Sequence, residues 1–362
     1  MKKYISLFIV ITLLVTASLS ASACGWKFKK KSKDVKVIEC PVNQSDFEIL
    51  PTMNTVSNAK NQVWVGTFQL IWNDLIDELV KRPVEFSGAK SVMADNLNKK
   101  TFTKDDLNES SYYKKFALAS LNVKKEIETA IKEKFNETSD ILGLFDWTPA
   151  EGKYILYAML KKDFQYIKPF DKLQDDSFNG SQNKVKYFGI DDNLSSNSLR
   201  HTIDVLFYNG TDDFAISLKS KQGDTVYLYR TNDEKTLDVL YEDMIAKSKA
   251  YEGDKWFTNA DKFKAPMIEF KSEREFPEIC NKPIKNSNFI ISRALETVQF
   301  KMDETGVKLK SEAGMMVETT AMPSRRILPR YFYFNDRYVI FLQEKDKPYF
   351  AMKIEDVEKI QK

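Results

Sequence analysis

Histidine is almost absent from this chain, since His201 is the only one among its 362 residues. A single histidine at the start of a predicted strand is more often structural than a general base. Three cysteines and one histidine do not supply a zinc cluster, and the 12 glycines form no phosphate-binding loop. We therefore expect no metal, no cofactor and no enzymatic activity.

An excess of charge of either sign is also missing. The 55 lysines and arginines nearly balance the 52 aspartates and glutamates, which leaves a net charge of +3. Composition therefore gives no reason to expect a nucleic-acid partner. Carboxylate pairs at 191–192 and 212–213 are adjacent at predicted turns, where such side chains diverge into solvent rather than act together. With 43% hydrophobic and 13% aromatic residues, the chain can bury a sizeable core.

The N-terminal segment has the pattern of an export signal. Lys2 and Lys3 precede a mostly apolar stretch at 5–19, which is shorter than a typical membrane span. The small residues at 21–23 (Ala-Ser-Ala) suit ordinary signal peptidase, which would release a secreted protein. Together with Cys24 they also resemble a bacterial lipobox, in which Cys24 becomes the lipidated first residue. We predict a signal peptide at 1–23 and a bacterial protein that is extracellular or at the cell surface.

A basic tether is predicted at 24–60, and it contains six lysines between positions 27 and 36. One lipid chain anchors a protein weakly, and a polybasic patch on an anionic membrane surface strengthens that attachment. The same composition also suits a flexible, solvated leader. If Cys24 is lipidated, Cys40 and Cys280 remain, and in an exported protein these two cysteines could form a disulfide.

Helical patterns occupy the first half of the predicted domain. Apolar residues at helical spacing predict an amphipathic helix over 63–79 that stops near Pro83. A polar stretch at 84–115 indicates short helices and loops, and a second helix is predicted at 123–135, ending by Asn136. The continuous apolar run at 154–160 is typical of a strand that is covered on both faces.

Strand patterns dominate from residue 203 onward. One helix interrupts them at 237–245. Turn sequences at 209–210 (Asn-Gly) and 222–223 (Gln-Gly) separate the earlier strands. The predicted strands are 203–208, 214–218, 225–229, 267–270, 294–300, 338–342 and 349–353. Because no linker interrupts the chain, we predict a single α+β domain at 61–362.

The order of these elements resembles that of the serpin family, protease inhibitors that trap their target by loop insertion. The most distinctive match is 164–171 (Phe-Gln-Tyr-Ile-Lys-Pro-Phe-Asp), where serpins have an aromatic residue, a spacer and a Pro-Phe-Asp-like tripeptide. Residues 66–68, 223–240 and 265–270 resemble further serpin elements in the same order. The resemblance implies a serpin-like fold with a central mixed or antiparallel β-sheet, N-terminal helices and a long exposed C-terminal reactive loop.

Two features depart from the family pattern. The region 84–120 is too short for the helices and sheet edge that serpins place there, so we expect an abbreviated helical region. The family's Arg-Pro-Phe element in the penultimate strand is replaced by Asp-Arg-Tyr at 336–338. The resemblance is therefore to a divergent member of the family.

Serpin-type inhibition would need no catalytic residue in this chain. A protease cuts the exposed loop, the freed segment inserts into the sheet as a strand, and stored free energy drives the step. Glu304 and Gly306 match the family's hinge, where glycine supplies backbone freedom. After insertion, alternate residues from Val307 and Leu309 to Ala313 would face inward.

The bait for the protease lies in a dibasic tract at 323–326 (Pro-Ser-Arg-Arg). Counting back from Phe334 places the cut near Arg325 or Arg326, whereas counting forward from Gly306 places it near Thr320. An arginine before the cut implies a trypsin-like serine protease as the partner. The alternative interpretation is that both arginines are ordinary exposed loop charges.

A second hypothesis is that the chain has the same serpin-like fold but does not inhibit a protease. Inhibitory serpins favour small hinge residues, whereas Leu309, Lys310 and Glu312 are bulky or charged and should slow insertion. A slow inserter is cleaved as a substrate, so the chain could be a non-inhibitory surface binding or structural lipoprotein. In either case we expect a monomer. The aromatic run at 331–334 is expected in the core or at a sheet edge, and would be a partner-binding patch if exposed.

Overall fold

The strand-forming segments of the C-terminal half assemble mainly into one seven-stranded sheet, with the order β1-β2-β19-β18-β12-β11-β10. The computed structural model describes residues 46–88, 90–191, 197–307 and 328–361. Only β1 and β2 pair in parallel, so the sheet is mixed, as expected. The strands are β1 (Phe47–Leu50), β2 (Asn61–Val65), β10 (Ile203–Tyr208), β11 (Phe214–Lys219), β12 (Thr225–Arg230), β18 (Tyr338–Gln343) and β19 (Pro348–Ile354).

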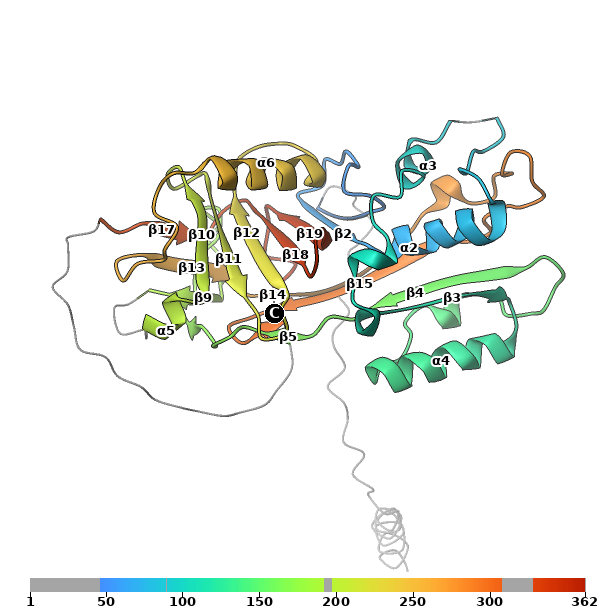
Figure 1. The fold of residues 1–362 in the computed structure, drawn as a ribbon, viewed down its shortest axis with the longest axis horizontal. Coiled ribbons are helices and arrows are strands. Elements are labelled where there is room, and N and C mark those ends of the chain that lie inside the picture. Colours follow the sequence, from blue (N-terminus) through green and yellow to red (C-terminus); the bar gives the residue numbers. More distant parts are fainter. Residues whose placement is uncertain (1–45, 89, 192–196, 308–327, 362) are drawn as a thin grey trace, which may run out of the picture. The chain divides into compact units, whose positions relative to one another are not determined.

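Helix α6 (Leu237–Ala250) covers one face of this sheet (Figure 1). Its residues Leu237, Leu240 and Met244 recur at three- to four-residue spacing and are fully buried against the sheet. The predicted helix and its apolar face are confirmed, and they enclose the largest core of the described residues.

A second, smaller sheet has four strands in the order β17-β13-β9-β6. Its strands are β6 (Asp171–Lys172), β9 (Tyr187–Ile190), β13 (Lys262–Pro266) and β17 (Tyr331–Tyr333). The aromatic run at 331–334 is divided between core and surface, because Phe332 and Phe334 are fully buried while Tyr331 is 42% exposed. The shorter elements nearby are β7 (Asp176–Ser177), β8 (Lys184–Val185) and α5 (Asn197–Arg200).

Two long hairpin-like pairs make up the rest of the β-structure. β3 (Tyr112–Leu118) pairs with β4 (Tyr154–Leu160), and β14 (Ile268–Glu275) pairs with β15 (Leu295–Met302), both antiparallel. β3 and β4 lie between α2 (Thr67–Asp74) and α4 (Leu121–Phe135) (Figure 1). The remaining elements are η1 (Leu75–Val80), α3 (Val92–Leu97), η2 (Lys104–Asp106), η3 (Glu109–Ser111), η4 (Leu142–Leu144), η5 (Pro277–Ile279), β5 (Phe164–Gln165) and β16 (Gly306–Val307).

Strand β4 forms where its continuous apolar run predicted, but only one of its faces is buried and the other is half-buried. Ile155 and Tyr157 share one buried cluster with residues of α4. Leu156, on the opposite face, packs against the cluster built on α2. The end of α4 is also as predicted, because Asn136 takes the left-handed conformation (φ 54°) that closes a helix.

The sequence prediction failed in two places near the N-terminus. The tether was expected to reach residue 60, whereas Phe47–Leu50 forms β1 at the edge of the seven-stranded sheet. The first helix was expected to begin at residue 63, whereas Asn61–Val65 forms β2 and the helix begins at Thr67. All five residues of β2 are buried, and its two polar residues are followed by three apolar ones, so the sequence shows no strand alternation. All described residues belong to one compact unit, and its α+β composition is confirmed.

Candidate functional site

The central feature of the candidate site is a gap between strands β4 and β15. In the described ranges, β4 is hydrogen-bonded only to β3, and β15 only to β14. A cavity of about 500 Å³ lies between them and is lined by residues of both strands and of α2. Two neighbouring strands that do not pair leave backbone groups open to a further strand.

Both strands run toward the same end of the gap. Strand β4 leads into β5, strand β15 leads into β16, and β5 and β16 pair in an antiparallel manner. The chain therefore reverses direction between β15 and β16. A segment that continues from β16 would run antiparallel to both β4 and β15.

A four-residue turn, 303–306, makes this reversal. The carboxylate of Asp303 accepts hydrogen bonds from the backbone (2.9 Å) and hydroxyl (2.6 Å) of Thr305. The carbonyl of Glu304 accepts a hydrogen bond from the backbone of Phe170 (2.8 Å), and its carboxylate pairs with Lys172 (3.1 Å). The predicted hinge residue Glu304 is thus held against the 164–171 motif.

Gly306 occupies a position that no other residue would fit without strain. Its φ is +133°, and a Cβ atom there would lie 2.7 Å from the Cα of Gln165 and from the carbonyl oxygen of Phe164. The glycine therefore allows β16 to approach β5 closely. Val307 is the last described residue of this arm, so the positions of Leu309 and of the following loop fall outside the described residues.

The other end of the loop is held by a buried ion pair. Arg330 donates hydrogen bonds from Nε (3.1 Å) and Nη2 (2.7 Å) to the two carboxylate oxygens of Asp261, which is completely buried. The guanidinium also donates to the carbonyls of Asp254 and Trp256. Although burial disfavours the charged guanidinium, Asp261 raises the pKa of Arg330. The loop is thus fixed at both ends.

The 164–171 motif packs against the turn at 303–306. Phe164 and Tyr166 are fully buried and Phe170 is 4% exposed. The Tyr166 ring lies 5.0 Å from that of Phe170, and its backbone N–H donates to the carbonyl of Thr305 (3.2 Å). Burial raises the pKa of Tyr166. The turn at 303–306 therefore packs against this motif.

A buried charge cluster lies beside the hinge. Lys162, 9% exposed by its side chain, pairs with Asp224 (2.9 Å) and Glu344 (2.6 Å). The hydroxyl of Tyr349 also donates to Asp224 (2.9 Å). Burial works to raise the pKa of Glu344, yet hydrogen bonds from Lys162 and Asn108 hold it below its usual value. The cluster links the end of β4 to the seven-stranded sheet.

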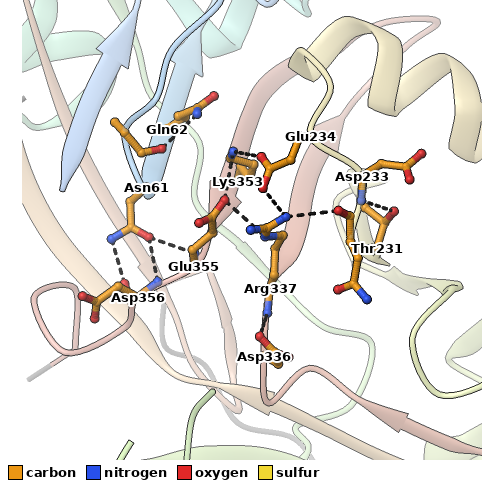
Figure 2. A network of polar contacts seen from close by, with 12 residues as sticks. Asn61, Gln62, Thr231, Asp233, Glu234, Asp336, Arg337, Lys353, Glu355 and Asp356 are labelled. Carbon is orange, nitrogen blue, oxygen red and sulfur yellow. Dashed lines mark hydrogen bonds and ion pairs between the residues drawn. The ribbon is translucent and has the colours of Figure 1, made fainter. Parts of the chain in front are cut away.

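Figure 2 shows a second charge network, around the Asp-Arg-Tyr segment at 336–338. Arg337 bridges Glu234 (2.5 Å) and Glu355 (3.2 Å), and Lys353 contacts the same two carboxylates (3.4 and 3.0 Å). The backbone N–H of Arg337 donates to the Asp336 carboxylate (2.7 Å), a hydrogen bond that a proline at this position could not make. The network ties β18 and β19 to the loop after β12.

Most of the predicted site residues fall outside the described part of the chain: Thr320, Arg325, Arg326, Leu309, Cys24 and Cys40. The Cys40–Cys280 disulfide therefore stays a prediction. Cys280 is half-buried and its thiol donates to the carbonyl of Phe276 (3.3 Å). The structure brings together the hinge residues and the 164–171 motif, which the sequence identified separately.

The sequence analysis did not single out two buried charged features, the ion pair of Arg330 with Asp261 and the carboxyl group of Glu296. Nothing local marks Arg330 as the partner of Asp261, which lies 69 positions away. Glu296 is 5% exposed and faces the gap, and its place on the same strand face as Val298 and Phe300 could have indicated its burial. Over the described ranges, no cluster of three or more acidic, histidine or cysteine residues suits a metal ion. None of the described helices is long and apolar enough to cross a bilayer.

Comparison with known proteins gives structural likeness without sequence similarity. No family model matches the chain, and no curated protein is similar to it in sequence. A highly specific serpin of the insect Tenebrio molitor is similar in structure, at 13% identity and a TM-score of 0.49, over 82% of this chain and 91% of the insect protein. Human thyroxine-binding globulin in complex with its hormone is similar at 10% identity and a TM-score of 0.42, over 79% of this chain and 95% of the globulin.

Proposed function

We propose that this chain is a serpin-like protein whose loop, 308–327, is cut by a serine protease of trypsin-like specificity. The segment before the cut then enters the gap between β4 and β15 as a new strand. The observation that carries the proposal is β16. Its two residues run antiparallel to β5, so a segment that continues in the same direction would run along the open edges of both strands.

The length of the loop suits this insertion. Strand β4 has seven residues, so residues 308–314 are enough to lie along it. The remaining residues, 315–327, include Thr320, Arg325 and Arg326 and would stay outside the inserted strand. Alternation supports the same arrangement, because Leu309, Ser311 and Ala313 would face one side of the inserted strand and Lys310 and Glu312 the other.

The primary experiment is cleavage of residues 25–362 with trypsin, read on a denaturing gel and by thermal unfolding. A covalent band of summed mass supports a trap. If insertion stabilises the protein by about 5 kcal/mol, the melting temperature should rise by roughly 10 °C, since about 2 °C corresponds to 1 kcal/mol in a domain of this size. Cleavage with free, active trypsin and an unchanged melting temperature would contradict insertion.

A matched pair of variants tests which face of the inserted strand becomes buried. Ala313→Glu places a charge on the face predicted to become buried, whereas Lys310→Glu places one on the face predicted to stay exposed, and neither change adds a trypsin site. We expect the first to abolish the rise in melting temperature after cleavage and the second to preserve it. Equal behaviour of both variants would show that the segment does not form this strand.

A non-inhibitory binding role on the same scaffold is the second candidate function. The observation that favours it is the large or charged character of Leu309, Lys310 and Glu312 at the start of the loop. In that case cleavage would leave the protease active. The gel described above separates the two functions, because only an inhibitor retains the protease in a covalent complex.

We also propose that the protein is exported and held at a membrane surface through Cys24. The run at 21–24 and the lysines between 27 and 36 support this assignment. The full chain should partition into the detergent phase, and a Cys24→Ser variant should move to the aqueous phase. Aqueous partitioning of both proteins would favour free secretion.

A further inference from the structure

The cavity between β4 and β15 has the size and lining of a small-molecule site. Its volume of about 500 Å³ lies within the range of ligand pockets. Apolar side chains make up much of its wall, including Phe68, Ile71 and Trp72 of α2 and Val298 and Phe300 of β15, and charged residues lie along it as well. A ligand with an apolar body could therefore be enclosed here.

One carboxylate in this wall has an unpartnered oxygen. Glu296 is 5% exposed, and its Oε1 accepts a hydrogen bond from the hydroxyl of Thr67. Its Oε2 is buried and has no hydrogen-bond partner in the described structure. Burial raises the pKa of Glu296 to about 8, against the opposing hydrogen bonds from Thr67 and the backbone of Phe68. Burial therefore favours the protonated form of the side chain at neutral pH.

The other charged groups near the cavity already have partners. At its rim, Glu137 pairs with Lys161, Asp140 with Lys271, Arg293 with Glu275, and Lys301 with Glu269. Arg274 lies close enough to lower the pKa of Glu296 slightly, but it pairs with Glu48 (2.5 Å) and Glu278 (3.1 Å). Glu296 is thus placed to receive a cation from outside the chain.

We propose that this cavity binds a small amphiphilic amine, with its ammonium group at the carboxylate of Glu296 and its apolar body along α2. In the free protein the buried acid avoids the cost of an unpaired charge by keeping its proton, whereas a bound ammonium would let it ionise and would donate to Oε2, which has no hydrogen-bond partner in the described structure. A neutral molecule of the same shape gains only the apolar contacts. This inference is separate from the proposed inhibition, since it concerns the intact loop and needs no protease.

Binding should have a proton signature. The free protein carries a proton on Glu296 at pH 7, whereas the complex pairs an ionised carboxylate with an ammonium. Each amine bound near pH 7 should therefore release about one proton to the buffer. At pH 9 the carboxylate is already ionised, and the release should largely disappear.

The experiment is isothermal titration calorimetry of intact residues 25–362 with n-octylamine, n-octanol and octanoate at pH 7. Titrations in phosphate and in Tris give the proton count, because these buffers differ in ionisation enthalpy. We expect octylamine to bind at least about tenfold more tightly than octanol, owing to the charge-assisted hydrogen bond. Octanoate should bind more weakly than either.

A matched pair of variants locates the site. Glu296→Gln should abolish both the preference for the amine and the proton release. Glu137→Gln changes a carboxylate at the rim of the same cavity, 40% exposed and already paired with Lys161, and should preserve both. Equal affinity for octylamine and octanol in the unaltered protein, or amine binding without proton release, would overturn the proposal. Neither of these two results depends on how well a variant folds.

Discussion

Replacement of Gly306 by alanine tests the geometry of the hinge directly. The residue has a φ of +133°, which L-residues rarely adopt. The added methyl group would lie 2.7 Å from the Cα of Gln165 and 2.8 Å from the backbone nitrogen of Tyr166. Both contacts are with backbone, so neither can be relieved by a simple rotation of a side chain.

The loss of stability is limited to the smaller of two costs, the backbone strain at residue 306 and the loss of the pairing between β16 and β5. Backbone strain of this kind costs about 1–3 kcal/mol. The alternative is to lose the two-residue pairing of β16 with β5, in which each hydrogen bond contributes about 1 kcal/mol. Either route predicts a loss of about 1–3 kcal/mol, which corresponds to a decrease in melting temperature of roughly 2–6 °C.

Thermal unfolding of the uncleaved protein is the assay, and Gly210→Ala is the matched control. Gly210 has a similar φ of +127°, but nothing lies within 4 Å of a Cβ atom built there. The control isolates the strain of the backbone conformation from the contact with β5. Gly306→Ala should therefore lower the melting temperature more than Gly210→Ala does, and it should also slow any rise that follows cleavage of the loop.

The reasoning would be refuted if the two variants had the same melting temperature. That result would mean that the close approach of β16 to β5 contributes nothing to stability. A Gly306→Ala protein that gained stability after cleavage as fast as the unaltered protein would equally show that this pairing does not guide insertion.

Three further predictions concern buried charges. Arg330→Ala should lower the free energy of unfolding in urea by about 3 kcal/mol, because it leaves the buried Asp261 without its cation. Lys162→Met should cost a similar amount, about 3 kcal/mol at pH 7. This loss should shrink as the pH falls below the ordinary glutamate pKa of 4.5, because Lys162 lowers the pKa of Glu344 and that stabilisation disappears once the carboxylate is protonated. Glu296→Gln should gain in melting temperature relative to the unaltered protein as the pH rises from 5 to 8. The folded state keeps a proton up to a pKa of about 8 that the unfolded state releases near 4.5, and the slope is at most about 1.4 kcal/mol per pH unit.

Each of these predictions has a control within the chain. Lys285→Ala removes an exposed ion pair with Glu85 and should cost less than about 1 kcal/mol, unlike Arg330→Ala. A pH-independent loss for Lys162→Met would show that its carboxylate partners do not titrate with it. A constant difference between Glu296→Gln and the unaltered protein from pH 5 to 8 would show that Glu296 is ionised throughout.

Local patterns predicted the regular elements of this chain well. Helix α4 follows from its apolar spacing and from Asn136 at its end, and β4 follows from seven consecutive apolar residues. The failures were short segments. Strand β1 has only four residues, and its partner β2 is buried throughout, so neither contains enough alternation to be distinguished from a coil or a helix.

The sequence by itself indicated α4, α6 and most of the later strands, because spacing, capping and turn chemistry act between near neighbours, and the resemblance to serpins singled out Gly306. The tertiary structure decided what surrounds them. The pairing of Gly306 with Gln165 and the ion pair of Arg330 with Asp261 join residues far apart in the chain. The gap between β4 and β15, with Glu296 buried in its wall, exists only because each strand pairs with a different neighbour, and no local pattern records that choice.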